Sequence, residues 1–86
     1  MTLDNWKKWG WQFSENRFSQ GFIFEDFQAA LSFINKVGIL SERLQHHPRI
    51  VNLYNEVVLE LWTHETNGIT TKDHLWIEEF QKERTL

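Results

Sequence analysis

Hydrophobic and polar residues alternate with a period of two in two parts of the chain, and this alternation predicts two β-hairpins. The first hairpin occupies residues 11–24, where Ser14-Glu15-Asn16 supplies the turn between its strands. The second has strands at residues 50–54 and 57–63, separated by a turn at Asn55-Glu56. Two hairpins provide the four strands of one antiparallel sheet.

The strand at residues 57–63 has one apolar face and one mixed face, because successive side chains point to opposite sides of a strand. The apolar face carries Val57, Leu59, Leu61 and Thr63, and the mixed face carries Val58, Glu60 and Trp62, followed by His64. We expect the apolar face to lie in the core. His64 then leaves the strand on the opposite side, beside Trp62.

Residues 25–45 show the spacing of an amphipathic helix. Its predicted buried stripe consists of Phe27, Ala30, Leu31, Ile34, Val37, Leu40, Ser41 and Leu44. Phe33 and Ile39 lie beside this stripe, and a mid-helix glycine such as Gly38 costs about 1 kcal/mol relative to alanine. These features indicate contact with a second copy of the chain; the alternative is a thick local core. Pro48 is expected to end this helix by excluding His47 from helical backbone.

Two further helices complete the prediction. A short first helix covers residues 3–9, capped by Thr2 or Asp4. The last helix opens with a capping box of Thr70 and Asp73, with aspartate in place of the usual glutamate. The resulting order, α-β-β-α-β-β-α, predicts an α+β fold in which helices pack on one face of a four-stranded antiparallel sheet. The length of 86 residues predicts a single domain over residues 1–86.

Composition narrows the classes of function. The net charge of −3 argues against nucleic-acid and acidic-membrane partners, which are bound by basic surfaces. No apolar run reaches the length of a membrane span, and the N-terminus lacks the apolar segment of a secretion signal. The chain has no cysteine for disulfides or thiolate metal sites. We therefore expect a cytoplasmic protein.

Three of the four histidines fall in two places, His46-His47 before Pro48 and His64 at a strand end. Imidazole exchanges protons near neutral pH, so these residues suit general acid–base catalysis. Glu42, one helical turn before His46, and Asp73 are carboxylates that could orient the rings. A metal site is the alternative, but the side chains of His46 and His47 diverge, so no metal is expected. No nucleophile motif or phosphate-binding glycine loop accompanies the histidines.

These residues together resemble a known signature. The pattern Glu42-Arg-x-x-His46-His47-Pro48, followed by Thr63-His64 and Gly68-x-Thr-x-x-Asp73, is similar to that of the pterin-4a-carbinolamine dehydratases. The segment Phe22-Ile-Phe-Glu-Asp-Phe27 resembles the family's lead-in to its long helix. The resemblance runs from about Trp11 to Phe80.

The resemblance implies a hydro-lyase that removes water from 4a-hydroxytetrahydropterin to give quinonoid dihydropterin, without a cofactor. This reaction recycles tetrahydrobiopterin for an aromatic amino acid hydroxylase. The implied catalytic residues are His46, His47, His64 and Asp73, with His46 and His64 as general acids. The implied substrate-binding residues are His47, Glu42, Thr63 and Trp62, the last added from strand alternation.

The resemblance also implies homodimers or homotetramers that associate through the long helix. Non-catalytic relatives with this fold act as assembly factors or as transcriptional coactivators and dimerisation partners. An interaction module is therefore the alternative function. The presence of His46, His47, His64 and Asp73 together favours the enzyme.

Overall fold

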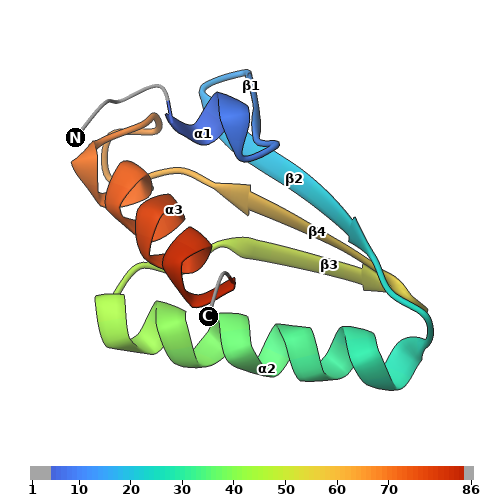
Figure 1. The fold of residues 1–86 in the computed structure, drawn as a ribbon. Coiled ribbons are helices and arrows are strands. Elements are labelled where there is room, and N and C mark those ends of the chain that lie inside the picture. Colours follow the sequence, from blue (N-terminus) through green and yellow to red (C-terminus); the bar gives the residue numbers. More distant parts are fainter. Residues whose placement is uncertain (1–4, 85–86) are drawn as a thin grey trace.

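The computed structural model describes residues 5–84, and the element order is the predicted α-β-β-α-β-β-α (Figure 1). The elements are α1 (Asn5–Lys8), β1 (Gln12–Ser14), β2 (Arg17–Ile23), α2 (Phe27–Leu44), β3 (Arg49–Leu53), β4 (Glu56–Leu61) and α3 (Thr71–Arg84). The first helix is one turn long, and the predicted caps at Thr2 and Asp4 lie outside the described residues. No helix within residues 5–84 has both the length and the hydropathy needed to cross a membrane.

The four strands form one antiparallel sheet in the order β1-β2-β4-β3. The two central strands pair Phe18 with Leu61 and Phe22 with Val57, and all four side chains are buried. The three helices cover this face, as Figure 1 shows. Val58, between the inward-facing residues of β4, is exposed on the uncovered face. The predicted α+β class with helices on one face is confirmed.

The core beneath the helices is aromatic. Trp11 lies with its ring centre 6.2 Å from Trp76 and 5.9 Å from Phe80, both edge-on. Trp76 and Phe80 stack at 5.1 Å. In a chain this small, large rings fill the space between a helix layer and a sheet with few residues.

The buried stripe of α2 differs from the predicted one at its edges. Ala30, Val37, Leu40 and Ser41 are buried as expected, but Phe27 is 45% and Leu31 37% exposed. Phe33, expected outside the stripe, packs 4.8 Å from Phe22 and 4.9 Å from Phe24 between ring centres. The physical reason is the position of α3. The Phe80 ring of α3 lies 5.9 Å from the Phe33 ring between centres, so Phe33 belongs to the packed side of α2. Ile39 is 69% exposed, as predicted.

The two hairpin turns use left-handed backbone. Glu15 and Asn16 have φ of 51° and 62°, which makes the two-residue turn that matches strand twist. The second turn lies one residue earlier than predicted, at Tyr54-Asn55, because Glu56 already belongs to β4. The side chain of Asn52 holds this turn by donating to the carbonyl oxygens of Tyr54 and Glu56.

Candidate functional site

A shallow pocket of about 160 Å³ lies where the end of α2, the end of β4 and the start of α3 meet. Its lining residues are Gln45, His46, His47, Trp62, His64, Glu65 and Lys72. The pocket is smaller than the roughly 300–1,000 Å³ of typical ligand sites, so it suits a small molecule. The three predicted histidines converge on it from segments that are 17 or more residues apart in the chain.

The end of α2 determines where the first two histidines lie. The helix stops at Leu44 because Gln45 adopts left-handed backbone, with φ 52° and ψ 42°. The backbone N–H groups of Gln45 and His46 then donate to the carbonyl oxygens of Glu42 and Ser41. The prediction that Pro48 ends the helix was wrong, since the chain has left the helix before His47. The reversal at Gln45 turns His46 toward α3.

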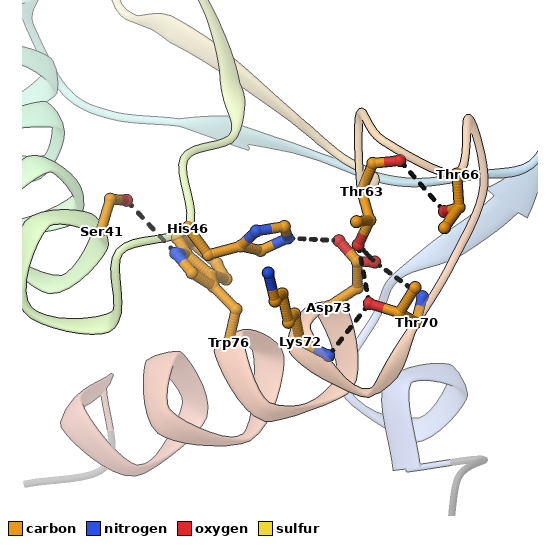
Figure 2. A network of polar contacts seen from close by, with 8 residues as sticks. All are labelled: Ser41, His46, Thr63, Thr66, Thr70, Lys72, Asp73 and Trp76. Carbon is orange, nitrogen blue, oxygen red and sulfur yellow. Dashed lines mark hydrogen bonds and ion pairs between the residues drawn. The ribbon is translucent and has the colours of Figure 1, made fainter.

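His46 pairs with Asp73 in the first turn of α3. The distance from His46 Nε2 to Asp73 Oδ1 is 2.6 Å, and the side chain of His46 is only 11% exposed. Asp73 is completely buried. Figure 2 shows the carboxylate between His46 on one side and Thr63 and Thr70 on the other. The sequence left open which histidine Asp73 orients, and in the structure it is His46.

The second oxygen of Asp73 is held by two donors. The Thr63 hydroxyl donates to Oδ2 at 2.7 Å, and the Thr70 backbone N–H donates to it at 2.9 Å. Asp73 thus makes its half of the predicted capping box, while the Thr70 hydroxyl caps the helix by accepting from the backbone N–H of Lys72 instead of that of Asp73. One carboxylate therefore both caps α3 and fixes His46.

This arrangement favours one tautomer of His46. Thr63 and Thr70 both donate to Oδ2 of Asp73, as to an ionised carboxylate, and we therefore expect Oδ1 to accept as well, with the proton on Nε2 of His46. Nδ1 of His46 is then the nitrogen available for proton exchange. A histidine whose second nitrogen is fixed by a buried carboxylate is an arrangement typical of acid–base catalysts.

His47 and His64 are held more loosely. His47 Nε2 lies 2.5 Å from Glu42 Oε2, but the two side chains are 55% and 74% exposed. The exposed ring of His64 stacks on Trp62, with centres 4.9 Å apart and planes at 28°. Strand alternation correctly predicted that His64 and Trp62 lie on the same side.

Sequence reasoning placed some residues in the pocket and missed others. His46, His47, Trp62 and His64 line it, whereas Thr63 is 3% exposed and contacts Asp73 instead. Glu42 is not among the lining residues and pairs with His47. The lining residues Gln45, Glu65 and Lys72 were missed, and their only signal was adjacency to predicted site residues. Residues 5–84 contain no cluster of three or more His, Cys, Asp or Glu side chains suited to a metal ion.

Comparison with known proteins identifies the family. The family model described as pterin 4 alpha carbinolamine dehydratase matches residues 1–82. The chain belongs to this family. A provisionally named pterin-4-alpha-carbinolamine dehydratase of Sulfurisphaera tokodaii is 39% identical over 64 residues, which are 74% of this chain and 69% of that protein. One of Prochlorococcus marinus is 36% identical over 73 residues, 85% of this chain and 76% of that protein.

A solved structure gives the same fold. The crystal structure of a transcriptional coactivator/pterin dehydratase from Brucella melitensis matches with a TM-score of 0.77 at 33% identity. The match covers 85% of this chain and 80% of that chain. The resemblance inferred from the histidine signature and the fold inferred from hydrophobic patterning therefore agree with independent relatives.

Proposed function

We propose that the protein dehydrates 4a-hydroxytetrahydropterins to quinonoid dihydropterins by general acid–base catalysis, without a cofactor. Support comes from family membership and from the convergence of His46, His47 and His64 on one small pocket. The observation that carries the proposal is the His46–Asp73 pair, because a buried carboxylate fixes the ring of a histidine that also faces the pocket.

The reaction needs two proton movements. The C4a–O bond breaks as the hydroxyl takes a proton and leaves as water, and a ring N–H loses its proton as the new double bond forms. In the proposal, protonated His46 gives its Nδ1 proton to the leaving hydroxyl while Asp73 holds Nε2. The proton released by the ring N–H, directly or through solvent, then protonates the neutral imidazole again, which returns the site to its starting state.

His64 and His47 take different parts. His64 enters the pocket from the end of β4, on another segment than His46, and serves as general acid for a hydroxyl on the opposite face of the pterin. His47 contacts and positions the ring system, and Glu42 orients His47 at 2.5 Å. Trp62 supplies an apolar wall beside His64.

The burial of Thr63 changes its proposed part. Its hydroxyl donates to Asp73 Oδ2 and lies 2.7 Å from the Thr70 hydroxyl, so its polar atom is already engaged within the protein. Thr63 is therefore a positioning residue for Asp73. Substrate contacts come from the residues that line the pocket.

The deciding experiment measures dehydration of a 4a-hydroxytetrahydropterin generated in situ by an aromatic amino acid hydroxylase. Wild type is compared with His46→Ala, His64→Ala and, as a matched control, His74→Ala, whose ring packs edge-on against Phe18 at 5.3 Å. Loss of either catalytic histidine is expected to lower the rate by about 10²-fold or more, since general acid–base groups contribute about 10²–10⁴-fold. His74→Ala is expected to retain the wild-type rate. No acceleration by wild type over buffer would falsify the proposal.

The same assay addresses the place of the reaction in metabolism. Its product is the oxidised pterin that a reductase returns to tetrahydropterin, so the proposed reaction recycles the pterin used by an aromatic amino acid hydroxylase. A hydroxylase limited by slow spontaneous dehydration is expected to turn over faster when this protein is added.

We also propose that the chain works as a homo-oligomer. Phe27, Leu31 and Ile39 expose apolar side chains along α2. A Cβ atom at Gly38 would meet nothing within 4 Å, so no neighbour in the same chain requires glycine there. These features support association with a second copy through α2.

The second candidate function is a protein-interaction module of the coactivator type. The Brucella melitensis relative carries both descriptions, transcriptional coactivator and pterin dehydratase. The exposed apolar residues of α2 would serve such a partner as well as a second copy. An inactive wild type that forms a stable complex through α2 with another protein would favour this function.

A further inference from the structure

The three histidines of the pocket are held in different ways. His46 and His47 each pair with a carboxylate, Asp73 and Glu42. The imidazole of His64 makes no hydrogen bond or ion pair within residues 5–84, and its recorded side-chain contact is the ring of Trp62 at 4.9 Å. What fixes Trp62 therefore also determines the orientation of His64.

Trp62 is held from the neighbouring strand. The guanidinium carbon of Arg17 lies 4.0 Å from the centre of the Trp62 ring. The antiparallel register that pairs Phe18 with Leu61 brings Arg17, the first residue of β2, opposite Trp62 on the uncovered face of the sheet. Both residues are half-buried. The contact is thus between elements of the sheet rather than between mobile surface side chains.

The Trp62 ring is the partner recorded for the guanidinium of Arg17 within residues 5–84. The guanidinium forms no ion pair with a carboxylate among residues 5–84, whereas Arg43 and Arg49 pair with Glu83 and Glu60. A planar cation over the face of an indole is attracted by the ring quadrupole, and tryptophan is the best aromatic acceptor of such a contact. Arg17 therefore contributes its cation to the Trp62 ring.

We infer that Arg17 is a positioning residue of the pterin pocket, acting through Trp62 to orient His64. The inference rests on the proposed function for its catalytic consequence. Arg17 restricts the rotamers of Trp62, and the restricted indole gives the exposed imidazole of His64 one stacking surface at the rim of the pocket. His64 is thus oriented by ring stacking, where His46 is oriented by a hydrogen bond.

The test first measures orientation without any substrate. Proton–carbon NMR spectra of the His64 ring, assigned with His64→Ala, report the ring-current shift caused by stacking on Trp62. In Arg17→Met, which keeps the apolar stem without the charge, the His64 signals are expected to move toward those of an unstacked imidazole. Arg17→Lys is expected to retain part of the shift because it keeps a cation.

Arg84→Met is the matched control. Its guanidinium carbon lies 5.0 Å from the Phe22 ring and 5.4 Å from the Phe80 ring. This variant therefore removes the same kind of contact at the C-terminal end of α3, whereas the pocket lies at the start of that helix. His64 signals in this variant are expected to match wild type. If the His64 signals of Arg17→Met also match wild type, the inference is wrong, whatever the activity.

The second measurement is a double-mutant cycle on dehydration. Loss of a cation–π contact between half-buried side chains corresponds to at least about a two- to fivefold change in population, so Arg17→Met is expected to lower kcat by a similar factor. In the His64→Ala background the same substitution is expected to have no further effect. An equal loss in both backgrounds would show that Arg17 does not act through His64. A wild type without dehydratase activity removes the proposed function, while the NMR comparison still decides the positioning.

Discussion

His46 and Asp73, 27 positions apart in the sequence, are joined by a contact of 2.6 Å between Nε2 and Oδ1. The carboxylate is completely buried and its other oxygen accepts from Thr63 and Thr70. The cap of α3 and the orientation of His46 thus both depend on the side chain of Asp73. Stability and activity can be separated at this residue by substitutions that keep its shape.

The substitution Asp73→Asn is expected to leave the fold intact and to change the tautomer of His46. The amide oxygen can still accept from Thr63 and Thr70, but the amide nitrogen then faces Nε2 as a donor. Nε2 then becomes an acceptor and the ring proton moves to Nδ1. In the neutral ring, Nδ1 is therefore no longer the nitrogen that can accept a proton. We expect kcat to fall by about 10²–10⁴-fold, the usual contribution of a positioned acid–base group.

Nitrogen NMR of the His46 ring measures this tautomer directly. Wild type is expected to show the proton on Nε2, and Asp73→Asn the proton on Nδ1. Circular dichroism and thermal unfolding of both proteins control for the cap of α3. A variant with wild-type kcat would show that the pair has only a structural role.

Thr63→Val tests the support behind the carboxylate. Valine has nearly the same shape, but Asp73 Oδ2 then keeps only the Thr70 backbone donor in place of two. We expect the free energy of unfolding to fall by about 1–3 kcal/mol, as for loss of a buried hydrogen bond to a charged group. Thr66→Val is the control, because the exposed Thr66 donates only a 3.3 Å bond to a carbonyl oxygen. Urea unfolding gives both values, and equal losses would contradict the prediction.

Much of the fold could be predicted from the sequence because its signals are local. The alternation of Val57, Leu59 and Leu61 determined which face of β4 is buried, and all three are inaccessible in the structure. The capping box of Thr70 and Asp73 marked the start of α3 to within a residue. The edge of the stripe on α2 was not predictable in this way. Whether Phe33 or Leu31 is buried depends on where α3 packs, which no local pattern encodes.

The candidate site likewise has residues that the sequence predicts and contacts that it does not. The three histidines could be found because imidazole is rare and their spacing is characteristic, and the pocket contains all three. The partner of Asp73 could not be predicted from the sequence. The chain reverses direction at Gln45 through left-handed backbone, and glutamine is not a residue type that indicates this conformation. That reversal brings His46, rather than His64, to the carboxylate. Arg17 carried no signal because its partner Trp62, just beyond the end of β4, is distant in the sequence.

Ser41→Ala is expected to destabilise the region behind the site. The buried Ser41 hydroxyl donates to the Val37 carbonyl oxygen and accepts from Trp76 Nε1 at 3.2 Å, and the Ser41 carbonyl accepts from the His46 backbone. Without the hydroxyl, the buried indole N–H has no partner, which costs about 1–3 kcal/mol. Ser32→Ala on the exposed side of α2 is the control and is expected to change stability by less than about 0.5 kcal/mol. Thermal unfolding of the two variants should therefore differ, and indistinguishable midpoints would count against the hydrogen bond.

The oligomer proposed through α2 predicts that one charge on its exposed apolar side breaks the assembly. Leu31→Glu is preferable to a charge at Phe33, because Phe33 packs into the core against Phe22, Phe24 and Phe80, where a carboxylate would unfold the chain. Burying an unpaired charge costs several kcal/mol, so sedimentation velocity should show a smaller species with unchanged circular dichroism. Ser32 is unsuitable as a control because it lies seven residues before Ile39, on the same side of α2; Thr71→Glu adds the same charge at an exposed position at the start of α3 and is expected to keep the wild-type mass. A wild type that sediments as a monomer, or a Leu31→Glu variant of unchanged mass, would exclude this interface.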